Sequence, residues 1–155
     1  MKIHDLINGC IAMENASAFI YSKFMQLFPK EKDFWEDLYN DEMSHSSFLN
    51  DVEYYEMFKG LQISDLPLSI SLIEKTLKFV EKISEHIKFN PVSFEDALRI
   101  ALKIEETMVE IFTNDLISIA ITNNESFLEK IFRDERLHVD KIKNMMIKKG
   151  YLKVS

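Results

Sequence analysis

An acid followed three residues later by a histidine occurs twice in this sequence, both times in a segment with helical apolar spacing. The first copy is DEMSH at 41–45, and the second is DERLH at 134–138. On an α-helix, residues i and i+3 project from one face about 5 to 6 Å apart, so each Glu-x-x-His aims two metal-ligand groups the same way. A single copy is more often a polar stretch on a solvated helix face. Whether two copies indicate a metal-binding site depends on the residues around them.

Composition favours one helical domain spanning residues 1–155. The chain has only three Gly and three Pro, and 46% of its residues are hydrophobic. The formal net charge is -7 without any block of Lys and Arg, which argues against a nucleic-acid partner. Charges interrupt every apolar stretch, so we expect no membrane span and no signal peptide. Cys10 is the single cysteine, which excludes an internal disulfide or a CxxC metal knuckle. A cytoplasmic protein is expected.

Apolar residues at three- and four-residue spacing predict four long amphipathic helices. Their expected ranges, in chain order, are about 2–28, 30–60, 93–116 and 122–150. Pro29 separates the first two helices. A heptad-like pattern over 70–87 predicts a shorter helix, after a loop at 61–69. The expected fold class is therefore all-α, an antiparallel four-helix bundle with a long central crossover that contains an extra short helix.

Two further acids stand on helix faces that are otherwise apolar. Glu14 is flanked at helical spacing by Cys10 and Ala18, and Glu105 is flanked by Ala101. Both Glu-x-x-His pairs are also in line with apolar residues. Burying an unpaired ion costs several kcal/mol, so these side chains need a neutralising partner. The candidate metal ligands are Glu14, Glu42, His45, Glu105, Glu135 and His138.

Chain distances favour one shared site for these six residues. Glu14 lies 15 residues before Pro29 and Glu42 lies 13 after it, so a hairpin at Pro29 places both at nearly one level. Glu105 and Glu135 become level if the second turn lies near Ile119. Four carboxylates balance the charge of two divalent cations, while each imidazole holds one metal. The sequence therefore predicts a site for two metal ions.

On these six positions the chain resembles the ferritin-like di-iron carboxylate proteins, closest to their rubrerythrin and bacterioferritin branch. The resemblance covers the four long helices and implies a ferritin-like bundle with two iron ions as cofactor; manganese or zinc would suit the same ligands. It also implies that Glu42 and Glu135 bridge the metals. Asp41 and Asp134 match aspartates that hydrogen-bond the ligand histidines in this family.

Two tyrosines stand close to predicted ligands. Tyr21 lies two turns after Glu14, and Tyr39 lies one turn before Glu42. Either hydroxyl is a candidate to hydrogen-bond a metal carboxylate or to hand over an electron in catalysis. The alternative for both is ordinary packing in the core or at its rim.

The resemblance implies an oxidoreductase of the peroxidase or ferroxidase type, which reacts with oxygen or hydrogen peroxide and is reduced by a separate electron-donor protein. The chain departs from rubrerythrins because Cys10 alone cannot supply their cysteine-ligated iron domain, and because Leu102 and Met108 stand where an extra acid is expected. The alternative is a non-catalytic metal-binding or storage bundle, since the same six ligands serve both functions. Surplus apolar surface predicts a homodimer.

Overall fold

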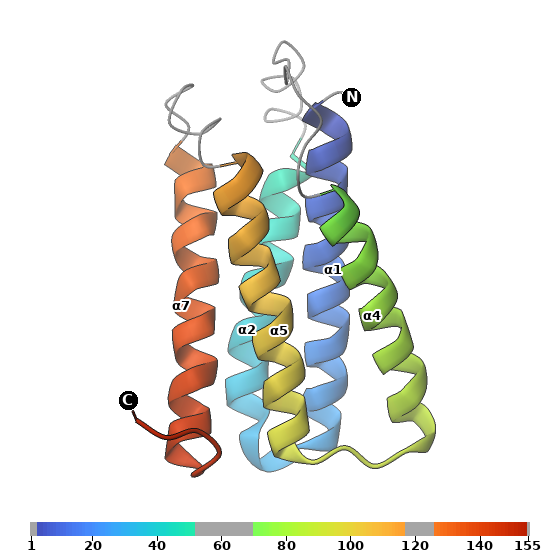
Figure 1. Ribbon diagram of the computed structural model, residues 1–155, viewed down its shortest axis with the longest axis vertical. Coiled ribbons are helices and arrows are strands. Elements are labelled where there is room, and N and C mark those ends of the chain that lie inside the picture. The colour runs from blue at the N-terminus through green and yellow to red at the C-terminus, as the bar shows by residue number, and fades with distance from the viewer. Residues whose placement is uncertain (1–2, 52–69, 117–125, 155) are drawn as a thin grey trace. The chain divides into compact units, whose positions relative to one another are not determined.

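The computed structural model describes residues 3–51, 70–116 and 126–154 (Figure 1). Within these ranges the chain forms five α-helices and no strand, so the all-α prediction is confirmed. None of the helices in these ranges is long and apolar enough to cross a membrane. The α-helices are α1 (Ile3–Leu27), α2 (Lys32–Leu49), α4 (Ile70–Phe89), α5 (Phe94–Ile111) and α7 (Ser126–Lys148).

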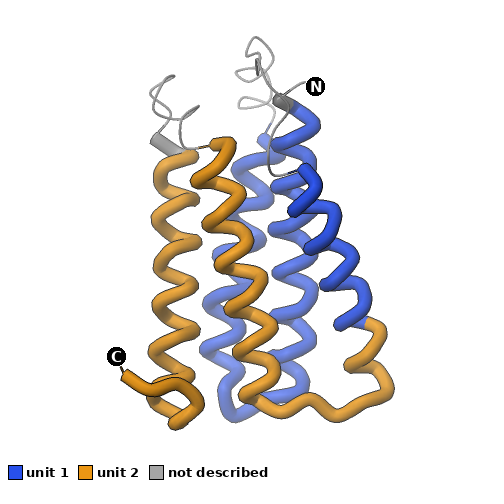
Figure 2. Tube along the Cα trace, in the orientation of Figure 1, with its two compact units in different colours: residues 1–84 blue, residues 85–155 orange. Residues whose placement is uncertain are grey.

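The chain divides into two compact units, residues 1–84 and 85–155 (Figure 2). The first unit holds α1, α2 and most of α4, and the second holds the end of α4 with α5 and α7. In each unit two long helices pack against each other, α1 with α2 and α5 with α7. The antiparallel four-helix bundle and the single domain over 1–155 stay predictions.

A proline makes the turn of the first unit. α1 ends at Leu27, and Pro29–Glu31 form one turn of 3₁₀-helix, η1, before α2 starts at Lys32. Pro29 has no N–H to donate and its ring clashes with the preceding turn, so α1 cannot continue through it. The two helices therefore fold back on each other as the hairpin expected from the sequence.

Aromatic rings fill the α1–α2 seam near this turn. The Trp35 ring centroid lies 5.8 Å from that of Tyr21, with the rings stacked, and 4.8 Å from that of Phe24. Phe34 meets Trp35 edge-on at 4.9 Å. Aromatic pairs in such arrangements add to the stabilisation from burial alone. Trp35, Tyr21 and Phe24 are fully buried, so this end of the hairpin is a packed apolar core.

α1 buries a wider arc than the sequence predicts. Besides the expected face, Leu6, Met13 and Ile20 are fully buried. α4 comes close to α1 at Gly9: a Cβ built there would lie 3.1 Å from Ile73 Cδ1, which is tighter than ordinary contact. The absence of a side chain at residue 9 thus lets Ile73 approach the α1 backbone at this point.

Two helices differ in length from the prediction. α2 ends at Leu49 rather than near Gly60, with Asn50 N donating to Ser46 O at 3.0 Å. Asn50 is followed by Asp51, and both side chains favour turns over helix because they compete for backbone hydrogen bonds. The extra helix in the connection is confirmed as α4, but its 20 residues make it no shorter than α2, with 18. The loop predicted at 61–69 lies outside the described residues.

Ser93 caps the start of α5 in the second unit. Ser93 Oγ accepts a hydrogen bond from Asp96 N at 3.0 Å, which satisfies one free N–H of the first turn of α5. After Ile111 the winding widens into one π-helical turn, η2 (Phe112–Leu116). The start predicted for the last helix near Thr122 lies outside the described residues. Near the end of α7, Ile142 and Met146 are buried.

Gly150 ends α7, as the sequence predicts. Its φ is 80°, in the left-handed region that favours glycine. Gly150 N donates to Ile147 O at 3.0 Å, and Tyr151 N donates to Met146 O at 2.8 Å. This is the Schellman pattern, in which the two residues after the helix satisfy carbonyls of its last turn.

Replacing Gly150 with Ala should lower the free energy of unfolding by about 1 to 2 kcal/mol, because a Cβ disfavours the left-handed conformation. Gly150→Asn should lose less, since asparagine tolerates this conformation. Urea unfolding followed by circular dichroism measures both. Lys148→Ala, an exposed change two residues earlier, is the control. Equal stability of Gly150→Ala and the parent protein would contradict the assignment of this cap.

Candidate metal-binding site

Three buried ligand-type side chains come together in the first unit. Glu14 on α1 and Glu42 and His45 on α2, here called triad 1, each offer a ligand atom, and these atoms lie within 4.8 Å of one another. His45 Nδ1 is 3.5 Å from Glu14 Oε2. Both carboxylates are fully buried and His45 is 2% exposed. The first hairpin thus assembles two acids and an imidazole from two helices.

The second unit contains a matching group, here called triad 2. Glu105 on α5 and Glu135 and His138 on α7 also offer ligand atoms within 4.8 Å of one another. His138 Nδ1 lies 3.4 Å from Glu105 Oε2 and 3.7 Å from Glu135 Oε2. Both carboxylates are fully buried and His138 is 3% exposed. All six predicted ligands are therefore buried, three in each unit.

Helix geometry explains why each triad forms. Glu and His three residues apart lie on one face of α2, and the same spacing aligns the pair on α7. In each unit the partner helix then supplies one more Glu across the seam. In the second unit, the residue next to this Glu shows how narrow the buried face is. Glu106 is 53% exposed and turns outward, although Glu105 is buried.

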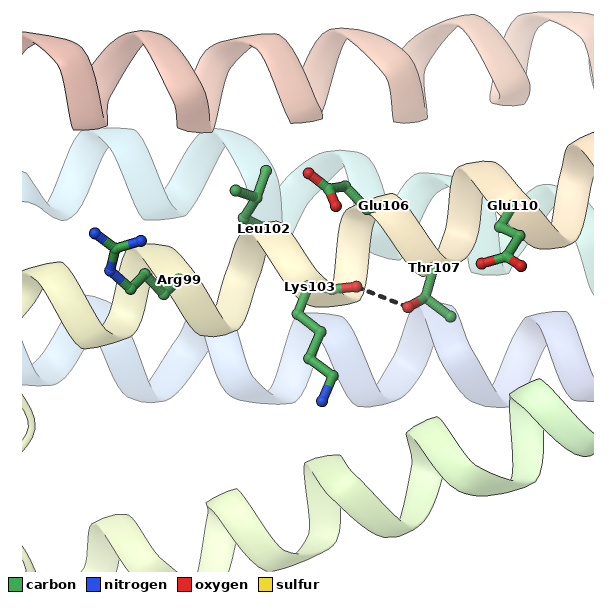
Figure 3. Close-up of a pocket in the computed structure, with 6 residues that line it drawn as sticks. All are labelled: Arg99, Leu102, Lys103, Glu106, Thr107 and Glu110. Atoms are coloured by element: carbon green, nitrogen blue, oxygen red, sulfur yellow. Dashed lines mark hydrogen bonds between the residues drawn. The ribbon is translucent and has the colours of Figure 1, made fainter. Parts of the chain in front are cut away.

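Figure 3 shows this outer face of α5. A shallow groove of about 320 Å³ runs along it, and the Thr107 hydroxyl donates to Lys103 O at 2.7 Å within the helix. Charged side chains dominate its lining, so we assign it to the solvated face of α5 on which Glu106 lies. The groove is lined by Arg99, Leu102, Lys103, Glu106, Thr107 and Glu110.

The donor set of each triad suits a divalent transition metal. Carboxylate oxygens and a neutral imidazole nitrogen bind iron, manganese or zinc. Two ionised carboxylates beside a neutral imidazole carry a charge of -2, which one divalent cation cancels. Without a cation, burial makes such like charges costly, because their mutual repulsion is weakly screened. Each triad is therefore a buried group that could hold one metal ion.

The two aspartates next to the ligand glutamates are less enclosed than the triads. Asp41 is exposed on α2. Asp134 on α7 is partly buried, and its Oδ2 lies 3.4 Å from Lys130 Nζ. Their roles as hydrogen-bond partners of the ligand histidines stay predictions.

The two candidate tyrosines lie in different surroundings. Tyr21 is fully buried and stacked on Trp35, so packing accounts for its ring. Tyr39 is partly exposed on α2. In the second unit the position two turns after Glu105 holds Phe112, also buried. A catalytic role for either tyrosine hydroxyl stays a prediction.

Sequence reasoning missed one polar contact beside triad 1. Ser46 Oγ donates to Asn15 Oδ1 at 2.6 Å, which joins α2 to α1. Each partner directly follows a ligand in the chain, Asn15 after Glu14 and Ser46 after His45. The adjacency of two small polar residues to two ligands was visible in the sequence, but the contact requires the register of the two helices.

Comparison with protein-family models, with curated proteins and with solved structures finds no match for this chain. The likeness to ferritin-like proteins therefore depends on the two triads and the helices that carry them.

Replacing Glu42 with Gln should stabilise the metal-free protein and weaken metal binding. The amide keeps the shape but removes one of two buried like charges, so the free energy of unfolding without metal should rise by roughly 1 to 3 kcal/mol, part of the cost of burying an ion. Thermal melts with and without Zn²⁺ test both effects. Glu106→Gln, which changes an exposed carboxylate, should alter neither. If the metal-free Glu42→Gln protein is less stable than the parent, repulsion between the buried carboxylates does not destabilise triad 1.

Proposed function

We propose that this protein is a di-metal carboxylate oxidoreductase, in which the two triads bind a pair of iron ions that reacts with oxygen or hydrogen peroxide. The observation that carries the proposal is the presence of two buried triads, each with two glutamates and one histidine. Together they offer four carboxylates and two imidazoles, which makes an uncharged site with two divalent cations. This is the ligand inventory of di-iron and di-manganese four-helix bundles.

Repetition along the chain supports a paired site over two independent ones. Asp, Glu and His of the first motif recur 93 residues later, and each motif has a partner glutamate on the preceding long helix. Two such hairpins packed as one ferritin-like bundle would place both triads in a common core. The glutamates at 42 and 135 are the proposed bridging ligands.

A bound pair of ferrous ions would supply the two electrons that reduce hydrogen peroxide to water, and an external donor protein would restore them. The chain's own contribution is to hold the ligands and to exclude water. Glu14, Glu42 and His45 are enclosed by the helix seam that Trp35 and its neighbouring rings close at one end. Such an enclosed site favours reaction with small oxidants over bulky substrates.

Metal stoichiometry tests the site. The parent protein should bind two Fe²⁺ or two Mn²⁺ per chain, Glu135→Ala at most one, and the Glu42→Ala, Glu135→Ala double variant none, because these glutamates are proposed ligands shared by both ions. Metal content after anaerobic loading and gel filtration gives the count. Full metal content in the double variant would end the proposal.

The electron paramagnetic resonance spectrum of the Mn²⁺-loaded protein tests whether the two ions form a pair. Exchange-coupled ions should give a spectrum distinct from that of isolated Mn²⁺, and Glu135→Ala should return the isolated type. Two uncoupled Mn²⁺ signals in the parent would show two separate mononuclear sites.

Turnover separates the oxidoreductase from the alternative, a metal-binding or storage bundle. The ferrous protein should be oxidised by peroxide or oxygen and cycle again when an artificial donor is supplied. The measurement is donor oxidation per chain, with the metal-deficient double variant as control. Oxidation that stops after one event, or iron accumulating beyond two per chain, would favour storage.

A further inference from the structure

One hydrogen bond ties α1 to α2 beside triad 1. The donor is Ser46 Oγ and the acceptor is Asn15 Oδ1, 2.6 Å apart, which is at the short end of the range for O–H···O bonds. Ser46 is buried and Asn15 is exposed, so the bond lies at the edge of the helix seam. We call this bond the α1–α2 clamp. It links the residues next to Glu14 and His45.

The clamp counteracts a repulsion that the triad itself creates. Glu14 and Glu42 are fully buried and of like charge when ionised, and they stand on the two helices that the clamp joins. In a metal-free protein this repulsion favours separation of α1 from α2 at the level of the triad. A hydrogen bond one residue from two of the ligands resists that separation.

We propose that Asn15 and Ser46 are positioning residues that keep triad 1 in its metal-binding arrangement before the metal arrives. This inference rests on the proposed function, because it requires triad 1 to bind a divalent metal. If only a fraction of the metal-free molecules has the triad assembled, the apparent dissociation constant rises by the inverse of that fraction. Loss of the clamp lowers that fraction and therefore weakens metal binding.

The second unit lacks the same device at the matching positions. Glu106 follows Glu105, and Val139, which follows His138, has no polar side-chain atom. There α5 and α7 are joined instead by Glu106 Oε1 and Lys143 Nζ at 3.9 Å, with both side chains about half exposed. Exposed ion pairs of this kind contribute little and are screened by salt. The clamp is thus a property of triad 1, and its loss should leave triad 2 unaffected.

The test uses Co²⁺ as the probe in the full chain carrying His138→Ala, which removes the imidazole of triad 2, so that triad 1 is the single complete triad. Titration followed by the visible absorption of bound Co²⁺ gives its dissociation constant. Adding Ser46→Ala should raise this constant about three- to tenfold, in keeping with one lost hydrogen bond. Ser46→Thr keeps the hydroxyl and should restore binding.

Ser17→Ala is the matched control. Ser17 is also buried near Glu14 on α1, but its hydroxyl donates to Met13 O at 2.9 Å within the same helix. Its removal should leave Co²⁺ affinity unchanged. Asn15→Ala should weaken Co²⁺ binding as Ser46→Ala does. The double variant Asn15→Ala, Ser46→Ala should bind Co²⁺ no more weakly than either single variant, because both changes remove the same hydrogen bond.

The outcomes distinguish failure of this inference from failure of the proposed metal-binding function. Unchanged Co²⁺ affinity in Ser46→Ala, with normal binding in the His138→Ala parent, would overturn the clamp and leave the metal site intact. Equal weakening by Ser17→Ala and Ser46→Ala would also overturn it, since it would reveal general destabilisation. No Co²⁺ binding by the parent would overturn the proposed function and this inference together.

Discussion

The stability of the two hairpins depends on how the negative charge of their buried carboxylates is balanced. In each unit two glutamates lie beside one histidine with almost no solvent contact. Apolar packing on both sides of each triad supplies the folding free energy that keeps these acids out of water. The histidine nitrogens lie 3.4 to 3.7 Å from glutamate oxygens, and a neutral imidazole adds no charge that would balance the carboxylates. A divalent cation would supply that charge and join two helices of each unit.

The two triads have the same types of side chain but differ in their surroundings. In the first unit Tyr21 and Trp35, each seven residues from a triad glutamate, form a stacked aromatic pair. At the same spacing the second unit has Phe112 and Leu128, both buried and without polar atoms in their side chains. At these positions the first unit therefore has two aromatic side chains with polar groups, the Tyr21 hydroxyl and the Trp35 indole N–H, whereas the second unit has purely apolar side chains. The same set of two glutamates and one histidine thus stands in two different environments.

Much of the site was predictable because spacing on a helix fixes direction. The Glu-x-x-His pairs and the lone glutamates at 14 and 105 stood out as acids in apolar stripes, and all six are buried. Residues that end helices were equally informative, since Pro29 and Gly150 lie at the helix ends that the sequence predicts. Local pattern failed where tertiary contacts decide. Leu6 and Met13 are buried although the apolar pattern did not mark them, and the Asn15–Ser46 bond reflects the register between helices.

The π-helical turn at Phe112–Leu116 affects how α5 can change in length. A π turn accommodates one residue more than an α turn, because its hydrogen bonds run from i to i+5. Phe112 and Leu116, at its two ends, are both buried, so the widened winding keeps the apolar face inward. Glu105 lies a full two turns earlier, in regular helix. This turn is thus a point where the chain could gain or lose a residue over evolution without rotating Glu105 out of the core.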